Sequence, residues 1–211
     1  MTPTGALASG LEQLALTLPE GASEKLFEYL EMLAKWNRTY NLTAIRSPLE
    51  MVTHHLLDSL AALPHLVAPE HATLADAGSG GGVPGIPLAI ARPEWRVTLN
   101  DASEKKTAFL RQAAIELRLA NVEVHEGRLE AWRPREGFAL VISRAFAELA
   151  DFIATCGHLV AGGGTLAAMK GACPRAELER IPADWRCDQV IPLRVPHLNA
   201  ERHLVLCRAV A

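Results

Sequence analysis

The sequence is short of the features that mark several common protein classes. Its 211 residues contain no stretch near the ~20 uncharged apolar residues that a membrane-spanning helix requires. The start of the chain lacks a basic segment and carries Glu12 among apolar residues, so we expect no secretory signal. Lys and Arg number 21 against 24 Asp and Glu, so the bulk charge does not indicate a nucleic-acid-binding protein. Aromatic residues make up only 5%, which leaves little surface for stacking on free single strands.

Cysteine is also scarce and scattered. The cysteines show no C-x-x-C spacing, which is evidence against a zinc site or a thioredoxin-type motif. Single scattered cysteines are typical of a reducing compartment, so we expect a cytoplasmic protein in which they are small buried hydrophobic residues. The four are Cys156, Cys173, Cys187 and Cys207.

Residues 1–70 have the pattern of helices. Apolar residues recur at three- and four-residue spacing over 26–36, and Ser23 is the candidate N-cap of that helix. A second run with the same spacing covers 51–63. Between the two runs, residues 37–45 lack this periodicity and are rich in turn-forming residues, so we expect a loop there.

From residue 72 onward, short apolar runs alternate with helical patterns. Strands are expected at 73–76, 97–101, 122–124, 138–142 and 165–169. The three consecutive glycines before the last of these strands, Gly162–Gly164, are predicted to form a turn. Two further strands, 190–195 and 203–206, form a candidate hairpin at the end of the chain.

This alternation predicts the fold class. Strands and helices that alternate along a chain form a mainly parallel sheet covered on both faces. We therefore expect an open, doubly wound, Rossmann-like α/β sheet over residues 71–211, preceded by a helical N-terminal extension over residues 1–70.

A glycine-rich segment follows the first predicted strand and precedes a helix. The spacing of Gly80, Gly82 and Gly85 matches the dinucleotide fingerprint G-x-G-x-x-G. With Asp76 and Gly78 in front, the segment also matches the pattern D-x-G-x-G-x-G, which resembles class I S-adenosylmethionine (SAM) methyltransferases. The segment is thus predicted to bind one of two cofactor classes at the carboxyl ends of the strands.

Two acidic residues bear on that choice. Asp76, just ahead of the glycines, suits the ammonium of SAM, directly or through water, better than it suits a pyrophosphate. Asp101 ends the next predicted strand, where a carboxylate accepts hydrogen bonds from both hydroxyls of a ribose. Together the loop and Asp101 predict an adenosine-containing cofactor, and by themselves they leave SAM and NAD open.

Several ordered segments carry a wider resemblance. The resemblance runs from about Leu26 to Cys207, nearly the whole chain, and includes the glycine loop. The segments are 36–45 (WNRTYNLTAI), 54–60 (HHLLDSL), 76–87, 142–145 (ISRA) and 169–171 (MKG). On these residues the chain resembles the bacterial 16S ribosomal RNA guanine-N7 methyltransferases, the RsmG (GidB) family.

The resemblance implies a class I methyltransferase fold, SAM as methyl donor, and N7 of one guanine in 16S ribosomal RNA as acceptor. It implies 16S ribosomal RNA or the small ribosomal subunit as partner, with no membrane or DNA, and a monomer. It places the cofactor against Gly78, Val83, Leu129, Glu130 and Arg144, with Asp101 and Ala102 on the ribose side. The alternatives are an NAD-dependent oxidoreductase and a non-catalytic, SAM-binding ribosome-assembly factor.

The chemistry of the acceptor narrows the catalytic requirement. Guanine N7 has a free lone pair at neutral pH, so its attack needs alignment and no general base. Lys170, at the end of a predicted strand, is expected to contact the RNA backbone or guanine O6 as a catalytic residue. Arg144 also ends a strand, and it is expected to serve the cofactor pocket and catalysis, with an ion pair to an acid as the alternative.

Two groups of polar residues remain. His54, His55 and Asp58 share one predicted helix, and we expect them to form a hydrogen-bond network between helices and sheet and to bind no metal. Six basic residues follow successive strands and are predicted to share one rim, where they supply a local patch for RNA. They are Arg128, Arg133, Arg135, Arg144, Lys170 and Arg175.

Overall fold

The first part of the chain is helical. The computed structural model describes residues 1–144, 146 and 148–210. Its N-terminal helices are α1 (Pro3–Gln13), α2 (Ala22–Tyr40), α3 (Pro48–Met51), a π-helical stretch (Val52–Leu57), α4 (Asp58–Leu60) and a short 3₁₀ turn (Leu63–His65). Within the described ranges, no helix combines the length and the apolar character needed to cross a bilayer.

The rest of the chain builds a seven-stranded sheet with the order β3-β2-β1-β4-β5-β7-β6. Its strands are β1 (Thr73–Ala77), β2 (Arg96–Asp101), β3 (Val122–Glu126), β4 (Phe138–Ser143), β5 (Val160–Lys170), β6 (Trp185–Pro192) and β7 (His203–Ala209). The first five strands are parallel, and β7 is antiparallel to both β5 and β6. The predicted mainly parallel sheet and the predicted C-terminal hairpin are therefore confirmed.

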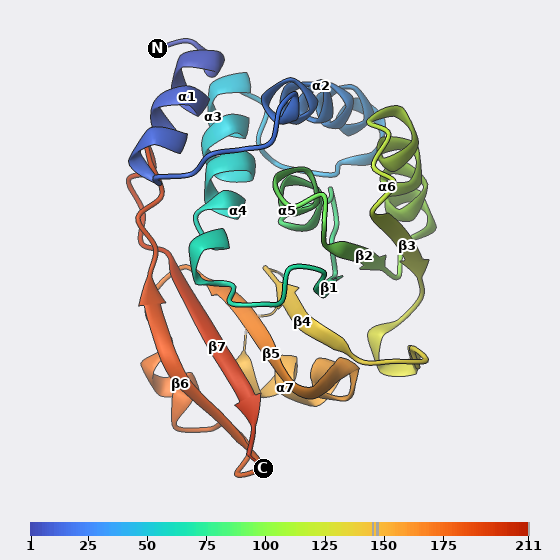
Figure 1. The fold of residues 1–211 in the computed structure, drawn as a ribbon, viewed down its shortest axis with the longest axis vertical. Helices are drawn as coiled ribbons and strands as arrows, with labels where there is room; N and C mark the ends of the chain where they lie inside the picture. Colours follow the sequence, from blue (N-terminus) through green and yellow to red (C-terminus); the bar gives the residue numbers. More distant parts are fainter. Residues whose placement is uncertain (145, 147, 211) are drawn as a thin grey trace.

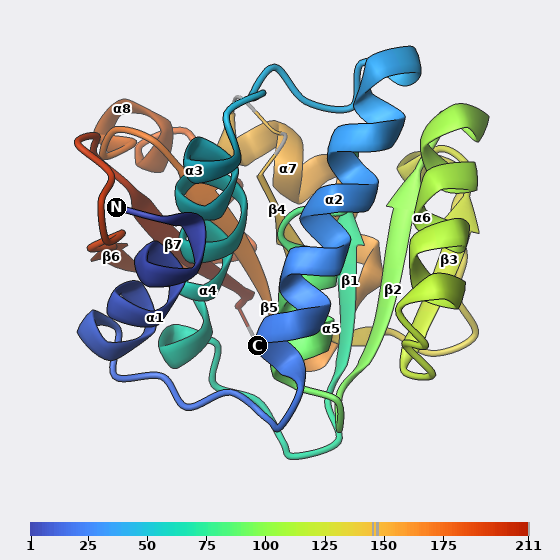
Figure 2. The ribbon, with the colours of Figure 1, turned by 90° about the horizontal axis from the view of Figure 1, so that it is seen from above.

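Helices cover both faces of this sheet (Figures 1 and 2). On one face lie α5 (Gly85–Ala91) and α6 (Glu104–Glu116), with α2 packed on top of both. The other face carries α7 (Leu149–Cys156), against which the short α8 (Arg175–Leu178) packs. Each face has its own apolar core, one around Leu99 and Phe109 and one around Phe152. The doubly wound prediction is confirmed by this two-sided packing.

The strand register places the carboxyl ends of β1, β2, β3 and β4 next to one another. Asp76 of β1 pairs with Leu99 of β2 and with Ile142 of β4, and Asp101 of β2 pairs with Glu126 of β3. Because these strands are parallel, their carboxyl ends meet at one edge of the sheet, where ligands bind in such folds.

Two predictions about the N-terminal helices were wrong. Helix α2 continues to Tyr40 through the first residues of the predicted loop 37–45, of which 41–45 are irregular as expected, and its N-cap is Gly21 instead of Ser23. The buried Asn37 stays helical because its side-chain oxygen accepts a bond from the amide of Thr43, at 2.9 Å, in the chain that follows. Asn41 then ends the helix with a left-handed backbone at φ 50°.

The predicted glycine turn at Gly162–Gly164 was also wrong. The three residues lie inside β5, at the point where its register against β4 shifts. Phe138 pairs with Val160 and Leu140 pairs with Thr165, so the extra residues of β5 bulge out of the ladder. Glycines favour bulges as well as turns, so three consecutive glycines in a sequence do not distinguish the two.

The cysteine prediction also needs correction. Cys187 of β6 and Cys207 of β7 form a disulfide, because the antiparallel strands place them opposite each other with Cα atoms 4.0 Å apart. Cys173 is exposed, and only Cys156 is the buried free cysteine that was expected. Burial raises the pKa of the Cys156 thiol to about 12.

The helical extension is not separate from the sheet. Leu7 of α1, Leu33 of α2 and Leu60 of α4 belong to the same apolar core as Leu99 of β2. Residues 66–72 connect the last helical turn to β1. The boundary at residue 70 stays a prediction about domains.

Candidate active site

The glycine loop between β1 and α5 has a backbone that favours glycine. Gly78, Gly80 and Gly82 have φ values of 74°, 58° and 90°, in the left-handed region. The amide of Ser79 donates to the Asn100 carbonyl at 2.8 Å, which ties the loop to β2. These contacts hold the loop at the carboxyl ends of β1 and β2, as expected.

Gly85 brings α5 close to the sheet. Its amide donates to Oδ2 of Asp76 at 2.9 Å. A Cβ added at Gly85 would lie 2.6 Å from that same oxygen and would overlap the side chain of Leu99. The third glycine of the fingerprint is therefore required for packing between helix and strand.

Asp76 is a buried carboxylate that accepts a hydrogen bond from the start of α5. Its side chain is fully buried, and burial raises its pKa to about 6, although the bonds from Gly85 and Ser79 lower it. Its other oxygen, Oδ1, has no hydrogen-bond partner among the described residues. The bond from Gly85 shows that Asp76 supports the loop, and a contact of Asp76 with the ammonium of SAM, directly or through water, stays a prediction.

Asp101, predicted to bind a ribose, lies at the end of β2 beside the glycine loop. Its Oδ2 accepts the Gly80 amide at 3.0 Å and its Oδ1 accepts the Ser103 amide at 2.9 Å. Lys106 lies 3.5 Å from Oδ2. A carboxylate has about four acceptor positions, so lone pairs remain for two hydroxyl donors. Asp101 keeps 7% of its surface exposed beside the glycine loop, and the following Ala102 is exposed. This donor and acceptor set fits an adenosyl cofactor.

Three other predicted cofactor residues border the same edge. Leu129 and Glu130 lie on a 3₁₀ turn (Leu129–Ala131) directly after β3, with Leu129 half-buried and Glu130 exposed. Val83 is half-buried in the glycine loop and precedes Pro84 through a cis peptide bond. The fold thus brings the loop, Asp101 and this 3₁₀ turn to the ends of β1, β2 and β3.

Tyr29 is a supporting residue that the sequence reading missed. It is fully buried in α2, and its hydroxyl donates to the Gly81 carbonyl at 2.6 Å. Burial raises the pKa of this phenol, so it remains a donor. Leu33, one turn further along α2, contacts the position where a Cβ of Gly81 would lie. Helix α2 therefore supports the glycine loop through Tyr29 and Leu33.

Asp58 is the centre of a buried ionic network. It is 1% exposed, and it accepts Nη1 of Arg144 at 3.1 Å and Nε of Arg202 at 3.0 Å. The preceding stretch is π-helical, so the Asp58 amide donates to the Thr53 carbonyl, five residues back. The carbonyl of His54, in the same stretch, accepts a hydrogen bond from Nη1 of Arg144 at 2.7 Å. The expected network between helices and sheet is therefore present at Asp58, while His54 contributes only its backbone carbonyl among the described residues. Arg202 was not predicted, because it lies far along the chain.

His55 belongs to the same region. Its Nε2 lies 2.9 Å from Oγ1 of Thr43, which anchors the loop between α2 and α3. Burial and the nearby charge of Arg144 lower the pKa of His55 to about 4, so the ring is neutral at pH 7. Figure 2 shows this loop at the edge of the molecule to which the arrowheads of β1 and β2 point.

Lys170, at the end of β5, is paired. Its Nζ lies 2.8 Å from Oε2 of Glu177 on α8 and 3.4 Å from the Phe146 carbonyl. Its side chain is 9% exposed, so the ammonium is largely shielded from solvent. Its place at a strand end agrees with the prediction, and the ion pair with Glu177 was not foreseen.

A cavity of about 430 Å³ joins these groups. Arg144, Lys170 and Arg202 line it together with His54, His55 and Asp58, and the loop residues Thr43–Ile45 border it. It therefore lies at the carboxyl ends of β4 and β5, beside the predicted cofactor site, and its size suits part of a nucleotide. Ala145, the last residue of the predicted segment 142–145, lies outside the described residues.

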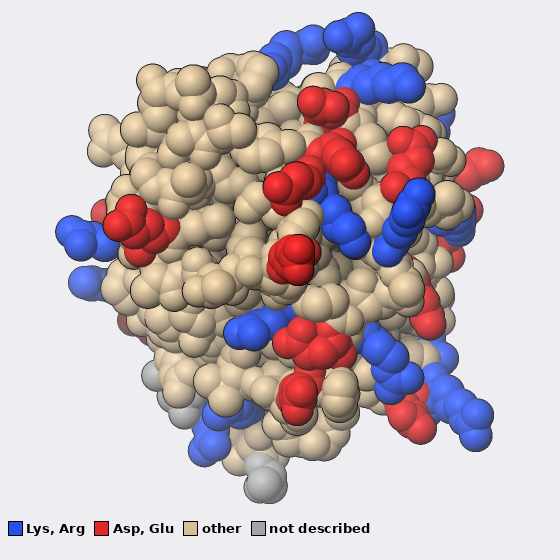
Figure 3. Space-filling model, turned by 45° about the horizontal axis from the view of Figure 1, so that its top comes forward, with Lys and Arg blue, Asp and Glu red and all other residues tan. Residues whose placement is uncertain are grey.

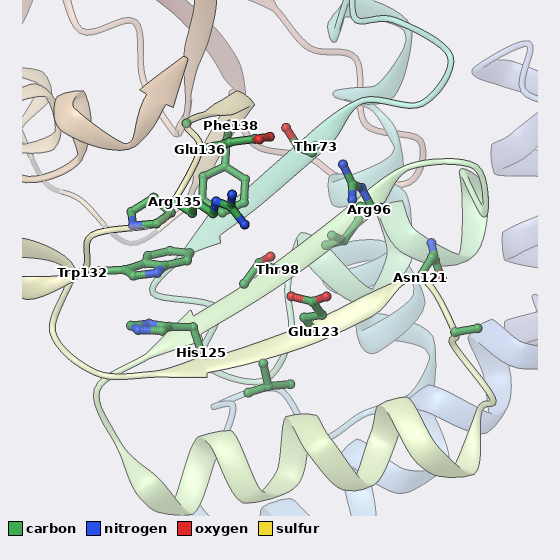
Figure 4. A pocket seen from close by; sticks show the side chains of 15 residues that line it. Thr73, Arg96, Thr98, Asn121, Glu123, His125, Trp132, Arg135, Glu136 and Phe138 are labelled. Atoms are coloured by element: carbon green, nitrogen blue, oxygen red, sulfur yellow. The ribbon is translucent and has the colours of Figure 1, made fainter.

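A larger cavity, of about 550 Å³, lies over the face of β2 and β3 and reaches the start of β1 (Figure 4). The connection from β3 to β4 holds only a 3₁₀ turn, so polar residues of β2 and β3 such as Thr98 and His125 face open space. His125 stacks on Trp132 at 4.3 Å between ring centroids. Arg135 lines this cavity, near the starting residue of β1, Thr73. Arg135 therefore does not share the predicted basic rim, because it precedes β4 instead of following a strand.

The surface carries both signs of charge. On the face shown in Figure 3, Lys and Arg side chains alternate with Asp and Glu side chains, and neither sign covers the face. This agrees with the formal net charge of −3. Any attraction to a polyanion must then come from local groups such as those in the 430 Å³ cavity.

The sheet order, the glycine loop and the acidic end of β2 define a class I SAM-dependent methyltransferase. Solved structures agree on the fold. A SAM-dependent methyltransferase from Aquifex aeolicus matches with a TM-score of 0.56 at 19% identity, covering 74% of this chain and 91% of its own. The complex of DhpI with SAH matches with a TM-score of 0.57 at 20% identity, covering 89% and 96%.

Sequence comparison goes further. The family model for rRNA small subunit methyltransferase G, GidB, matches residues 22–205. The protein of that name from Nitrosospira multiformis is 48% identical, with 99% of this chain and 98% of the relative covered. Its namesake from Neisseria meningitidis serogroup C / serotype 2a is 51% identical, with 95% of each covered. The chain belongs to the GidB family of small-subunit rRNA methyltransferases, so its cofactor is SAM and not NAD.

Proposed function

We propose that this protein transfers the methyl group of SAM to N7 of a specific guanine in 16S ribosomal RNA. One observation carries the proposal for this chain. The glycine loop with Asp101 and the cavity lined by Arg144 and Lys170 open at the same edge of the sheet. A donor site and an acceptor site that share an edge are what methyl transfer between two bound molecules requires.

The cofactor side is assigned to residues around the glycine loop. SAM supplies an electrophilic methyl group on a sulfonium. The carboxylate of Asp101 holds the ribose, and Gly78 lets the backbone approach the ligand without a Cβ. The remaining assigned residues are Val83, Ala102, Leu129 and Glu130, with Arg144 at the boundary between cofactor and acceptor.

The acceptor side needs orientation above all. Guanine N7 attacks without losing a proton, so no general base is required, and alignment is worth ~7–11 kcal/mol. A free ammonium against N7 would oppose the positive charge that develops on the base. The pairing of Lys170 with Glu177 at 2.8 Å moderates that charge. Lys170 is then suited to guanine O6 or to the RNA backbone.

Methylation of isolated substrates tests the proposal. The purified protein and SAM are incubated with unmodified 16S ribosomal RNA and with small ribosomal subunits, and the nucleotides are analysed by mass spectrometry. We expect 7-methylguanine at one position. Calorimetry should show binding of SAM and none of NAD. SAM binding without methylation of either substrate would favour a non-catalytic assembly factor.

Lys170→Ala is the matched variant for that assay. Because Lys170 lies outside the glycine loop, the variant should bind SAM normally and lose methyl transfer. Unchanged turnover would remove Lys170 from the site. Glu177→Gln is the control, since it leaves the lysine in place without its ion-pair partner.

A further inference from the structure

The ionic network around Asp58 has an unbalanced charge. One buried carboxylate faces two guanidinium groups, from Arg144 after β4 and Arg202 before β7. The third cation of the cavity, Lys170, is already matched by Glu177. The pair of arginines therefore leaves an excess of one positive charge at the 430 Å³ cavity. A partly buried charge of this kind attracts an anion more strongly than an exposed one does.

Both arginines still have donors to offer. Nη1 of Arg144 bonds to Asp58 and the His54 carbonyl, while Arg202 uses Nε for Asp58 and Nη1 for the Glu201 carbonyl. Among the described residues, no partner is found for Nη2 of either side chain. The two side chains are 29% and 23% exposed and line the cavity. Planar guanidinium groups that are held on one side suit the oxygens of a phosphate on the other.

The position of Asp58 explains why the arginines stay in place. It starts α4 directly after the π-helical stretch, and the same stretch supplies the His54 carbonyl that also binds Arg144. Arginine side chains are flexible, so without these acceptors the two groups would lose their shared orientation. The buried acid has little surface of its own for a ligand, at 1% exposure.

We propose that Asp58 is a positioning residue that holds Arg144 and Arg202 as a clamp for a phosphodiester of the RNA substrate, next to the acceptor guanine. This inference rests on the proposed function. It adds a binding role for Arg202, a residue of the C-terminal hairpin. The other oxyanion of matching chemistry is the carboxylate of SAM, and the test separates the two.

Asp58→Asn distinguishes positioning from simple charge. Removal of the carboxylate raises the local positive charge, so an effect of net charge alone would tighten RNA binding. If Asp58 positions the clamp, RNA binding weakens instead, by ~10-fold in KM for RNA, and the change falls on KM more than on kcat. Steady-state kinetics with small ribosomal subunits measure both constants. Tighter or unchanged RNA binding by a folded variant would overturn the proposal.

Arg202→Gln keeps the test decisive if Asp58→Asn does not fold. The affinity for 16S ribosomal RNA is measured over a range of salt concentrations by fluorescence anisotropy. Loss of one phosphate contact should reduce the slope of log affinity against log salt by about 0.7–0.9. Arg202→Lys should keep the slope and still weaken binding, because it keeps the charge and loses the planar fork.

Arg92→Gln is the matched control, because Arg92 caps α5 at the opposite edge of the sheet, where it pairs with Glu94 and lies over the Trp95 ring. An equal slope for Arg202→Gln and Arg92→Gln would overturn the clamp. A loss of SAM affinity in Arg202→Gln would assign it to the cofactor carboxylate and also overturn it. These outcomes differ from a failure of the proposed function, in which the unaltered protein itself would not methylate the RNA.

Discussion

Asp58 and Asp76 show how far a residue's surroundings decide its task. Both carboxylates are almost entirely buried. Asp58 forms ion pairs with two arginines, Arg144 and Arg202. Asp76 has no cation in contact among the described residues, so burial raises its pKa to about 6 and its accepted bonds come from the loop it supports. The same residue type thus organises an ionic site in one place and a backbone turn in the other.

Tyr29→Phe tests the support of the glycine loop by a single hydroxyl. The change leaves the Gly81 carbonyl without its buried donor, which should cost about 1–3 kcal/mol of unfolding free energy and weaken SAM binding. Urea unfolding and calorimetry measure the two effects. The other tyrosine, Tyr40, is 41% exposed, and Tyr40→Phe should change neither. Equal losses in both variants would contradict the assignment.

Helix α5 approaches β1 and β2 closely at its first residue, Gly85. The loop between β1 and α5 turns through three residues with left-handed backbone, and the helix then begins against the carboxylate of Asp76. A short helix of this kind, Gly85–Ala91, is fully buried along its length. Its contact with the strands therefore depends on the absence of a side chain at its first position.

Gly85→Ala should therefore disturb α5. The added methyl group would overlap Asp76 and Leu99, and overpacking of this kind costs about 1–3 kcal/mol. Thermal and urea unfolding measure the loss, and SAM affinity should fall with it. Gly162→Ala is the control, because nothing lies within 4 Å of its added Cβ, and it should stay within about 0.5 kcal/mol of the original. The packing argument fails if the two variants are equally stable.

At the scale of the whole molecule, the helical segment and the sheet form one packed body. Helix α2 contacts α5 and α6, and α4 contacts α5, so the helices of the first 65 residues cover apolar surface of the methyltransferase fold. The same helices supply Tyr29 to the glycine loop and Asp58 to the 430 Å³ cavity. Stability and site geometry therefore share this interface.

Residues 71–211 expressed alone should not fold stably. Removal of the helices exposes the face of α5 and leaves Arg144 and Arg202 without their carboxylate. We expect no cooperative unfolding transition in urea and strong binding of an apolar dye such as ANS. The full chain, treated identically, is the reference. A soluble fragment with a cooperative transition would instead support an independent domain boundary at residue 70.

The sequence by itself determined the fold class and the position of the glycine loop. Alternating apolar runs specify a doubly wound sheet because each buried strand needs cover on both faces. The glycine spacing behind Asp76 is local, so the sequence reveals the loop directly, and the role of Asp101 toward the ribose stays a prediction. Local signals misled at Asn37 and Gly162, where a hydrogen bond to Thr43 and a strand bulge outweighed the usual preference for a turn.

Only the tertiary structure decided the acceptor side. Arg144 and Arg202 meet at Asp58 although 86 and 144 residues separate each of them from it along the chain. The pairing of Lys170 with Glu177 and of Cys187 with Cys207 likewise depends on which elements lie side by side. Local sequence patterns do not predict such contacts, because the partners are brought together only by the order of the strands and the packing of the helices.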